Sequence, residues 1–202
     1  MNKKFIICCG LFLVCFLVSA QNSNQLKYYT RTWEDPDLYG CSEKILIYTD
    51  GDSVSAYCFF FCDAIGGTSS YLVGKSSGNT ISGIRYIPKY YDDGGFMGLY
   101  DYKFKIVIAA DKSTIKYYSS LDSDPGVLLP SDAKYTFYGG IEEVRDFPSG
   151  SSKVVFQTNV KKDWIRVLKI GKFEKIGESY DFWYEVKIDN KTGWLFGGLN
   201  LQ

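Results

Sequence analysis

Short runs of apolar residues alternate with turn-forming residues along most of the chain. Apolar runs at 45–49, 54–64 and 96–110 are separated by Asp-Gly, Gly-Asn and Asp-Asp-Gly-Gly, residues that tolerate the backbone of hairpin turns. No stretch has a 3.6-residue apolar period over three turns, and the best helix candidate is only 131–134. The pattern predicts an all-β protein that begins with an antiparallel β-sandwich or barrel of about six to eight strands.

The pattern changes in the segment 119–134, which is rich in serine, aspartate and proline. Beyond it the apolar runs are shorter, at 153–158, 164–171, 182–188 and 193–198. Short strands joined by turns over about 65 residues are typical of a small closed barrel. We therefore expect a first domain at 21–120, a linker at 121–134 and a small β-barrel at 135–202.

The first twenty residues are typical of a secretory signal peptide. A basic start with Lys3 and Lys4 precedes the apolar run 5–18, and small residues precede Gln21. A membrane anchor is the alternative, although the run is shorter than the span of about 20 residues that a helix needs. Lipid modification of Cys15 is another alternative, although Val14 stands where a small residue is required.

Cleavage after residue 20 predicts export to the periplasm, the cell surface or the extracellular medium, with no stable membrane span in the mature protein. Three cysteines remain, and an oxidising compartment permits a disulfide. Cys58 and Cys62 are about 13 Å apart along one expected strand, too far to bridge each other. Cys41 is therefore expected to pair with one of them, and three buried thiols are the alternative.

Charge and composition narrow the function. Removal of Lys3 and Lys4 leaves 21 basic and 23 acidic residues, a net charge of −2, so there is no basic excess for binding nucleic acid. The chain has no histidine, which excludes Ser-His-Asp and Cys-His catalysis and histidine-based zinc sites. Asp-rich turns such as 50–53 lack the oxygen spacing of a calcium loop. We expect no enzyme, no metal and no cofactor.

The segment 180–200, YDFWYEVKIDNKTGWLFGGLN, carries the most informative motif. Trp183 to Ile188 predicts a strand, residues 189–192 a turn, and Trp194 to Phe196 the returning strand. Gly197 and Gly198 then permit a tight bend that other side chains would resist.

This ending resembles the C-terminal half of a bacterial SH3 domain of the SH3b type, found in exported envelope proteins. The family's Trp-Tyr-x-Val strand is matched by residues 183–186, and its Gly-Lys-x-Gly-Trp-Val turn by residues 191–195. Its opening, Asn-Val-Arg-x-x-Pro-Ser, is matched by Val144, Arg145, Pro148 and Ser149, with Glu143 in place of the usual Asn. The similarity covers about a third of the chain.

The resemblance implies a non-catalytic binding or scaffolding module that contacts a cell-wall peptide or an envelope protein. An aromatic groove would carry such binding. The alternative for each candidate is core packing, because small barrels need large aromatics to fill them. The candidate groove residues are Tyr138, Trp164, Trp183, Tyr184 and Trp194.

The first domain suggests a second function. Its strand pattern around 69–86 resembles the meanders of lipocalin-like barrels, although a sandwich produces similar strings. A barrel with an internal cavity would act as a small-molecule carrier. A hydrolase or hydrolase regulator is a third hypothesis, which the missing histidine disfavours.

Overall fold

A computed structural model describes residues 25–35, 39–63, 66–90, 96–119, 126–132 and 135–201. The described chain is all-β, with fifteen strands and no helix. It accordingly contains no helix long and apolar enough to cross a membrane. The predicted signal peptide, with Cys15, lies outside the described residues.

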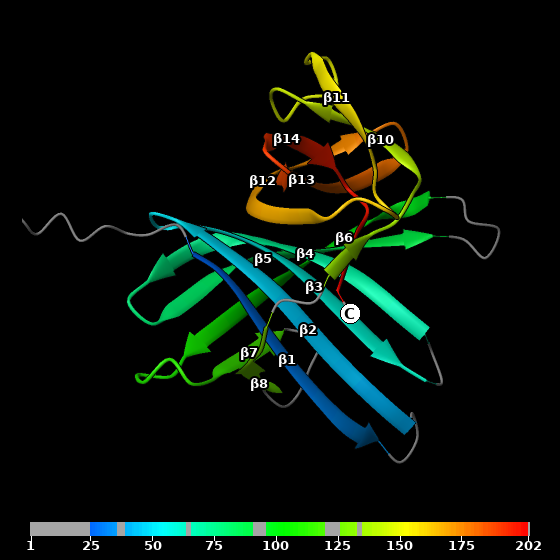
Figure 1. Cartoon of the computed structure of the whole chain (residues 1–202). Helices are drawn as coiled ribbons and strands as arrows, with labels where there is room; N and C mark the ends of the chain where they lie inside the picture. The colour runs from blue at the N-terminus through cyan, green and yellow to red at the C-terminus, as the bar shows by residue number, and fades with distance from the viewer. Residues whose placement is uncertain are drawn as a thin grey trace, which may run out of the picture.

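The first eight strands form a closed antiparallel barrel in chain order (Figure 1). β1 closes the barrel by pairing with β8, through Tyr29 with Pro130 and Thr30 with Leu129. Of the two architectures left open by the sequence, the barrel is therefore the one that forms. The strands are β1 (Gln25–Asp35), β2 (Tyr39–Asp50), β3 (Ser53–Cys62), β4 (Gly66–Ser77), β5 (Thr80–Tyr90), β6 (Phe96–Ile108), β7 (Ile115–Ser119) and β8 (Gly126–Pro130).

The C-terminal part consists of two antiparallel sheets. A five-stranded sheet has the order β11-β10-β14-β13-β12, and a two-stranded ladder joins β15 to β9. The strands are β9 (Tyr135–Phe137), β10 (Ile141–Arg145), β11 (Val154–Asn159), β12 (Ile165–Ile176), β13 (Ser179–Ile188), β14 (Lys191–Phe196) and β15 (Leu199–Leu201).

Two strands of the barrel, β1 and β8, were not predicted from the sequence. β8 falls within the expected linker 121–134, so the barrel extends to Pro130. β1 lies before the first apolar run of the sequence, at 45–49. Tyr28 and Tyr29 are adjacent residues of β1, and both are buried. Tyr28 packs in the cluster against the C-terminal sheets, and Tyr29 packs inside the barrel. A strand buried on both faces lacks the alternation that reveals most antiparallel strands.

The helix candidate 131–134 forms no helix at its described residues, 131 and 132.

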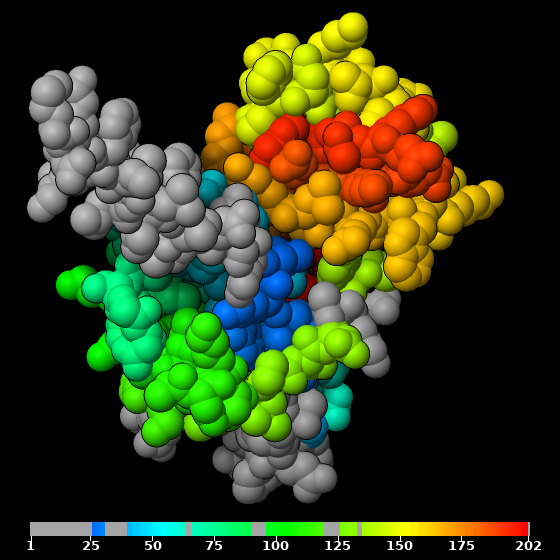
Figure 2. Space-filling view, turned by 60° about the vertical axis from the view of Figure 1, so that its left-hand side comes forward, coloured from blue at the N-terminus to red at the C-terminus, as the bar shows by residue number. Residues whose placement is uncertain are grey.

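The protein has two hydrophobic cores. The first fills the barrel interior and is built mostly from aliphatic side chains, including Ile45, Leu72, Ile106, Ile115 and Leu128. The second joins the outer face of the barrel to the C-terminal sheets, and it contains residues of both. In Figure 2 the C-terminal sheets, yellow to red, pack directly against the barrel.

Aromatic contacts dominate this second core. The Phe173 ring of β12 lies 4.8 Å from Tyr71 of β4 and 5.2 Å from Tyr86 of β5, measured between ring centroids. At the edge, the Lys169 ammonium lies 3.6 Å from the Asp50 carboxylate. The second core is therefore continuous between the outer face of the barrel and the C-terminal sheets.

One disulfide joins Cys41 to Cys62. The two residues are direct partners across β2 and β3, so their side chains meet on the same face. The pairing settles the choice left by the sequence, and it is consistent with an oxidising, extracytoplasmic compartment. Cys58 is a buried free thiol whose Sγ donates to Glu43 Oε1 at 3.6 Å.

Candidate binding surfaces

The five aromatic residues proposed for a groove do not share one surface. Trp183 and Tyr184 are only 1% and 0% exposed and belong to the core. Trp194 is half-buried, with its ring packed over the backbone at Gly171. Tyr138 and Trp164 are 64% and 84% exposed. Only these last two offer most of their surface to a partner.

The burial of the β13 aromatics has clear partners. The Trp183 Nε1–H donates to Glu174 Oε1 at 2.5 Å, and its ring lies 5.3 Å from that of Phe196. The Tyr184 hydroxyl donates to Asp181 Oδ1 at 3.0 Å. Both side chains are thus packed and hydrogen-bonded inside the fold.

Trp164 stands on the rim of a groove of about 580 Å³. We call this the Trp164 groove, and it is formed by β9, the β11–β12 turn and the start of β12. Tyr135 links two of these elements, because its hydroxyl accepts a hydrogen bond from the Val167 N–H at 2.6 Å. The Trp164 groove is lined by Tyr135, Thr136, Phe137, Val160, Lys161, Asp163, Trp164, Ile165 and Arg166.

A tightly bonded turn positions Trp164. Asp163 Oδ2 accepts hydrogen bonds from the Thr158 hydroxyl at 2.6 Å and the Asn159 N–H at 2.7 Å. These two bonds hold the pKa of Asp163 below its usual value. The Asn159 carbonyl accepts from the N–H groups of Lys162 and Asp163. These hydrogen bonds fix the backbone of the turn from which the exposed indole projects.

Charge around the groove is mostly basic. Lys161, Lys162 and Arg166 are exposed near the indole, with Asp163 the acidic neighbour engaged by the turn. Tryptophan and arginine are enriched at the energetic centres of protein interfaces. The groove is suited to a partner with an apolar group and a carboxylate.

The sequence offered Trp164 as a candidate, but not the residues that line the groove beside it. β9, which contributes Tyr135, Thr136 and Phe137, has three residues and shows no recognisable period. Its place beside the turn depends on long-range pairing with β15, which local sequence does not reveal. The available signal was the pair Lys161 and Lys162 close before Trp164 in the sequence.

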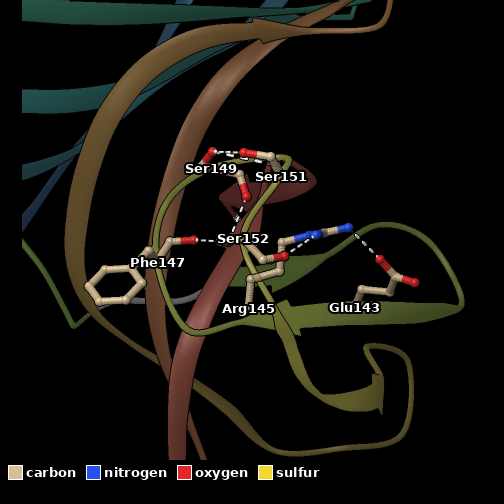
Figure 3. A network of polar contacts seen from close by, with 6 residues as sticks. All are labelled: Glu143, Arg145, Phe147, Ser149, Ser151 and Ser152. Atoms are coloured by element: carbon tan, nitrogen blue, oxygen red, sulfur yellow. Dashed lines mark hydrogen bonds and ion pairs between the residues drawn. The ribbon is translucent and has the colours of Figure 1, made fainter.

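The opening motif shapes a second loop, shown in Figure 3. The Arg145 guanidinium donates to the Ser152 carbonyl at 2.5 Å and to Glu143 Oε2 at 2.6 Å. The single O–H of Ser152 is shared between the carbonyl oxygens of Phe147 and Ser149, which lie 2.7 and 2.6 Å from Oγ. Arg145 therefore holds the loop 146–153 closed, and Phe147 is left 67% exposed at its edge.

A polar network lies where the barrel meets the C-terminal sheets. Asp181 accepts from the Phe182 N–H at 2.7 Å and from the Tyr184 hydroxyl, and Tyr71 of the barrel also hydrogen bonds to it. Burial raises the pKa of Asp181 to about 6, although these hydrogen bonds oppose the shift. The carboxyl is thus poised to change charge in mildly acidic conditions.

The barrel interior contains a polar layer next to its aliphatic core. Glu43, Ser70 and Arg85 are buried there, and Arg85 Nε donates to Ser70 Oγ at 3.1 Å. Burial, with the nearby Glu43 carboxylate, raises the pKa of the Cys58 thiol. Within the described ranges, no three His, Cys, Asp or Glu side chains are grouped to hold a metal ion.

Comparison with known proteins adds no relative. No protein-family model, curated protein or solved structure matches the chain.

Proposed function

We propose that the protein is an exported, non-enzymatic binding protein of the bacterial cell envelope, whose C-terminal sheets form an SH3b-like module. The observation that carries the proposal is the 84% exposure of Trp164 on the rim of a groove of about 580 Å³. Exposing a large indole on a fixed turn has no packing advantage, whereas such residues often dominate binding energy.

The motif residues support this module. In the Lys-Thr-Gly-Trp segment, Gly193 lies where a Cβ would be 2.5 Å from Val144 and 2.9 Å from the Arg145 carbonyl. Gly197 and Gly198 have φ values of 66° and 75°, which suit glycine at the bend before β15. Close packing at Gly193 and positive φ angles at Gly197 and Gly198 thus explain why glycine stands at the positions that resemble the SH3b ending.

The proposed partner is a cell-wall peptide or an envelope protein that presents a carboxylate beside an apolar group. The basic side chains Lys161 and Arg166 would orient the carboxylate, and Trp164 would cover the apolar group. A stem peptide of the cell wall has both features.

The test is retention of the mature chain, residues 21–202, on purified cell-wall sacculi. We expect Trp164→Ala to weaken retention by at least about tenfold, the loss typical of a binding hot spot. Phe147→Ala is the matched control, because it removes an exposed ring at the other end of the β10–β11 hairpin. Equal retention of the Trp164→Ala and native chains would contradict the proposal.

A small-molecule carrier is the alternative function. The aliphatic core inside the barrel is filled by side chains such as Ile45 and Leu128, both 0% exposed. A cavity of about 590 Å³ that opens between β4 and β5 is a place where such a ligand would fit.

A further inference from the structure

Two neighbouring barrel strands stop pairing before they end. The ladder between β4 and β5 reaches Tyr71 and Tyr86 and goes no further. β4 begins earlier, at Gly66, and β5 continues to Tyr90. The segments 66–70 and 87–90 nevertheless remain extended, because β3 pairs with the first and β6 with the second.

A cavity of about 590 Å³ lies between these segments. Both segments contribute to its walls, which shows that the divergence opens the barrel wall at this point. The lining residues are Gly67, Thr68 and Ser69 of β4, Ile87, Pro88 and Lys89 of β5, and Tyr71, Tyr100 and Tyr102.

The free edges of both segments face the opening. A strand directs its N–H and C=O groups alternately to its two neighbours. In the described part of the chain, no strand pairs with 66–70 or 87–90 on the side of the opening. Pro88 and Lys89 are the residue types that natural sheets place on edge strands.

The chemistry of the lining favours an acidic partner. Lys89 is the one charged residue among the described lining residues, and its Nζ lies 5.4 Å from the Tyr100 ring centroid. Hydroxyl groups of Thr68, Tyr100 and Tyr102 add hydrogen-bond donors, and none of the lining residues that the structure describes carries a carboxylate.

We propose that this opening binds a short extended peptide with an acidic side chain, which adds as a strand between β4 and β5. Main-chain hydrogen bonds to the two edges hold the peptide, and Lys89 selects the acidic residue. Four to five residues of extended chain, about 13–17 Å, match the length of the unpaired segments. The site is on the barrel and does not depend on the Trp164 groove.

The first experiment uses the mature chain, residues 21–202, and a random-peptide library displayed on phage. We expect the selected peptides to be acidic and rich in strand-forming residues. On binding a synthetic copy, the backbone N–H groups of 66–70, Ile87 and Lys89 that face the opening should gain protection from hydrogen exchange, since Pro88 has no N–H. Selection of no peptide, or protection confined to 135–137 and 160–166, would overturn the proposal.

A backbone-modified peptide separates strand addition from side-chain recognition. The same sequence with N-methylated amides cannot donate main-chain hydrogen bonds, so its affinity should fall by at least about tenfold. An N-methylated peptide that binds as tightly as the unmodified one would show that strand pairing is not involved.

Two lysine variants test the charge. Lys89→Glu should weaken binding of the acidic peptide by about tenfold or more. Lys105→Glu is the matched control, because Lys105 also lies over a tyrosine ring, 6.0 Å from that of Tyr118, but does not line the opening. Equal effects of the two variants would contradict a role for Lys89, whereas Trp164→Ala should leave peptide binding unchanged.

Discussion

Individual aromatic residues of the C-terminal sheets divide sharply by exposure. Trp183 on β13 is 1% exposed, and its indole N–H is bonded to Glu174. Trp164, at the end of a bonded turn, is 84% exposed. The first side chain stabilises the fold, and the second is the one available for recognition. Asp181 is the other distinctive residue, because it is a carboxyl group within a largely aromatic interface.

Asp181 makes stability depend on pH in an unusual direction. Its folded-state pKa of about 6 lies above the ordinary value of 3.8, so the folded state binds more protons than the unfolded state between these values. The contribution of Asp181 to the free energy of unfolding is therefore present below about pH 4 and lost as pH rises through about 6.

We expect Asp181→Asn to remove this dependence. The difference in free energy of unfolding between the native and variant chains should change by on the order of 1–3 kcal/mol from pH 4 to pH 7. Urea unfolding at several pH values measures it. A difference that stays constant with pH would show that Asp181 keeps an ordinary pKa.

Single glycines set how the strands of the C-terminal sheet approach one another. β14 touches β10 at one register pair, Arg145 with Trp194. Gly193 lies beside this crossing, where Val144 leaves no room for a side chain. The glycine of the motif thus permits two strands to come close at a point where packing is tightest.

Gly193→Ala should lower the free energy of unfolding by about 1–3 kcal/mol, because the new methyl group must displace Val144 or the Arg145 backbone. Gly140→Ala, in the bend just before β10, is the control, since a Cβ there meets no atom within 4 Å. Thermal unfolding of both variants measures the difference. Equal stability of the two would contradict this account of the motif.

The elements also show what local sequence can and cannot predict. Strands such as β3 and β6 follow from apolar runs bounded by Asp-Gly and Asp-Asp-Gly-Gly, and the bend at Gly197 follows from its glycine pair. β8 was missed because it is a short strand inside a segment of linker-like composition. The Trp164 groove was only partly predicted, because β9 joins it through long-range pairing with β15.

At the scale of the whole molecule, the barrel and the C-terminal sheets share one core. Tyr28, Leu46, Tyr48, Tyr57 and Tyr71 of the barrel belong to the same buried cluster as the C-terminal residues. The C-terminal sheets are thereby held on the outer wall of the barrel, and the Trp164 groove and the β4–β5 opening become parts of a single unit.

This shared core predicts one cooperative unfolding transition. Phe173→Ala removes a ring that contacts β4 and β5, and it should destabilise both parts together by about 2–3 kcal/mol. Hydrogen exchange measures the effect separately in β3 and β13. Phe147→Ala, which removes an exposed ring, is the control. Destabilisation of β13 alone would show that the barrel is stable without the C-terminal sheets.

The most direct test of the proposed function is a titration followed by nuclear magnetic resonance. The chain of residues 21–202 is titrated with soluble disaccharide-peptides released from cell-wall sacculi, and the Trp164 indole N–H and the backbone amides are observed. We predict that the indole signal and the amides of 135–137 and 160–166 shift, while those of 146–153 do not. Shifts confined to other residues, or no shifts at all, would contradict binding at the Trp164 groove.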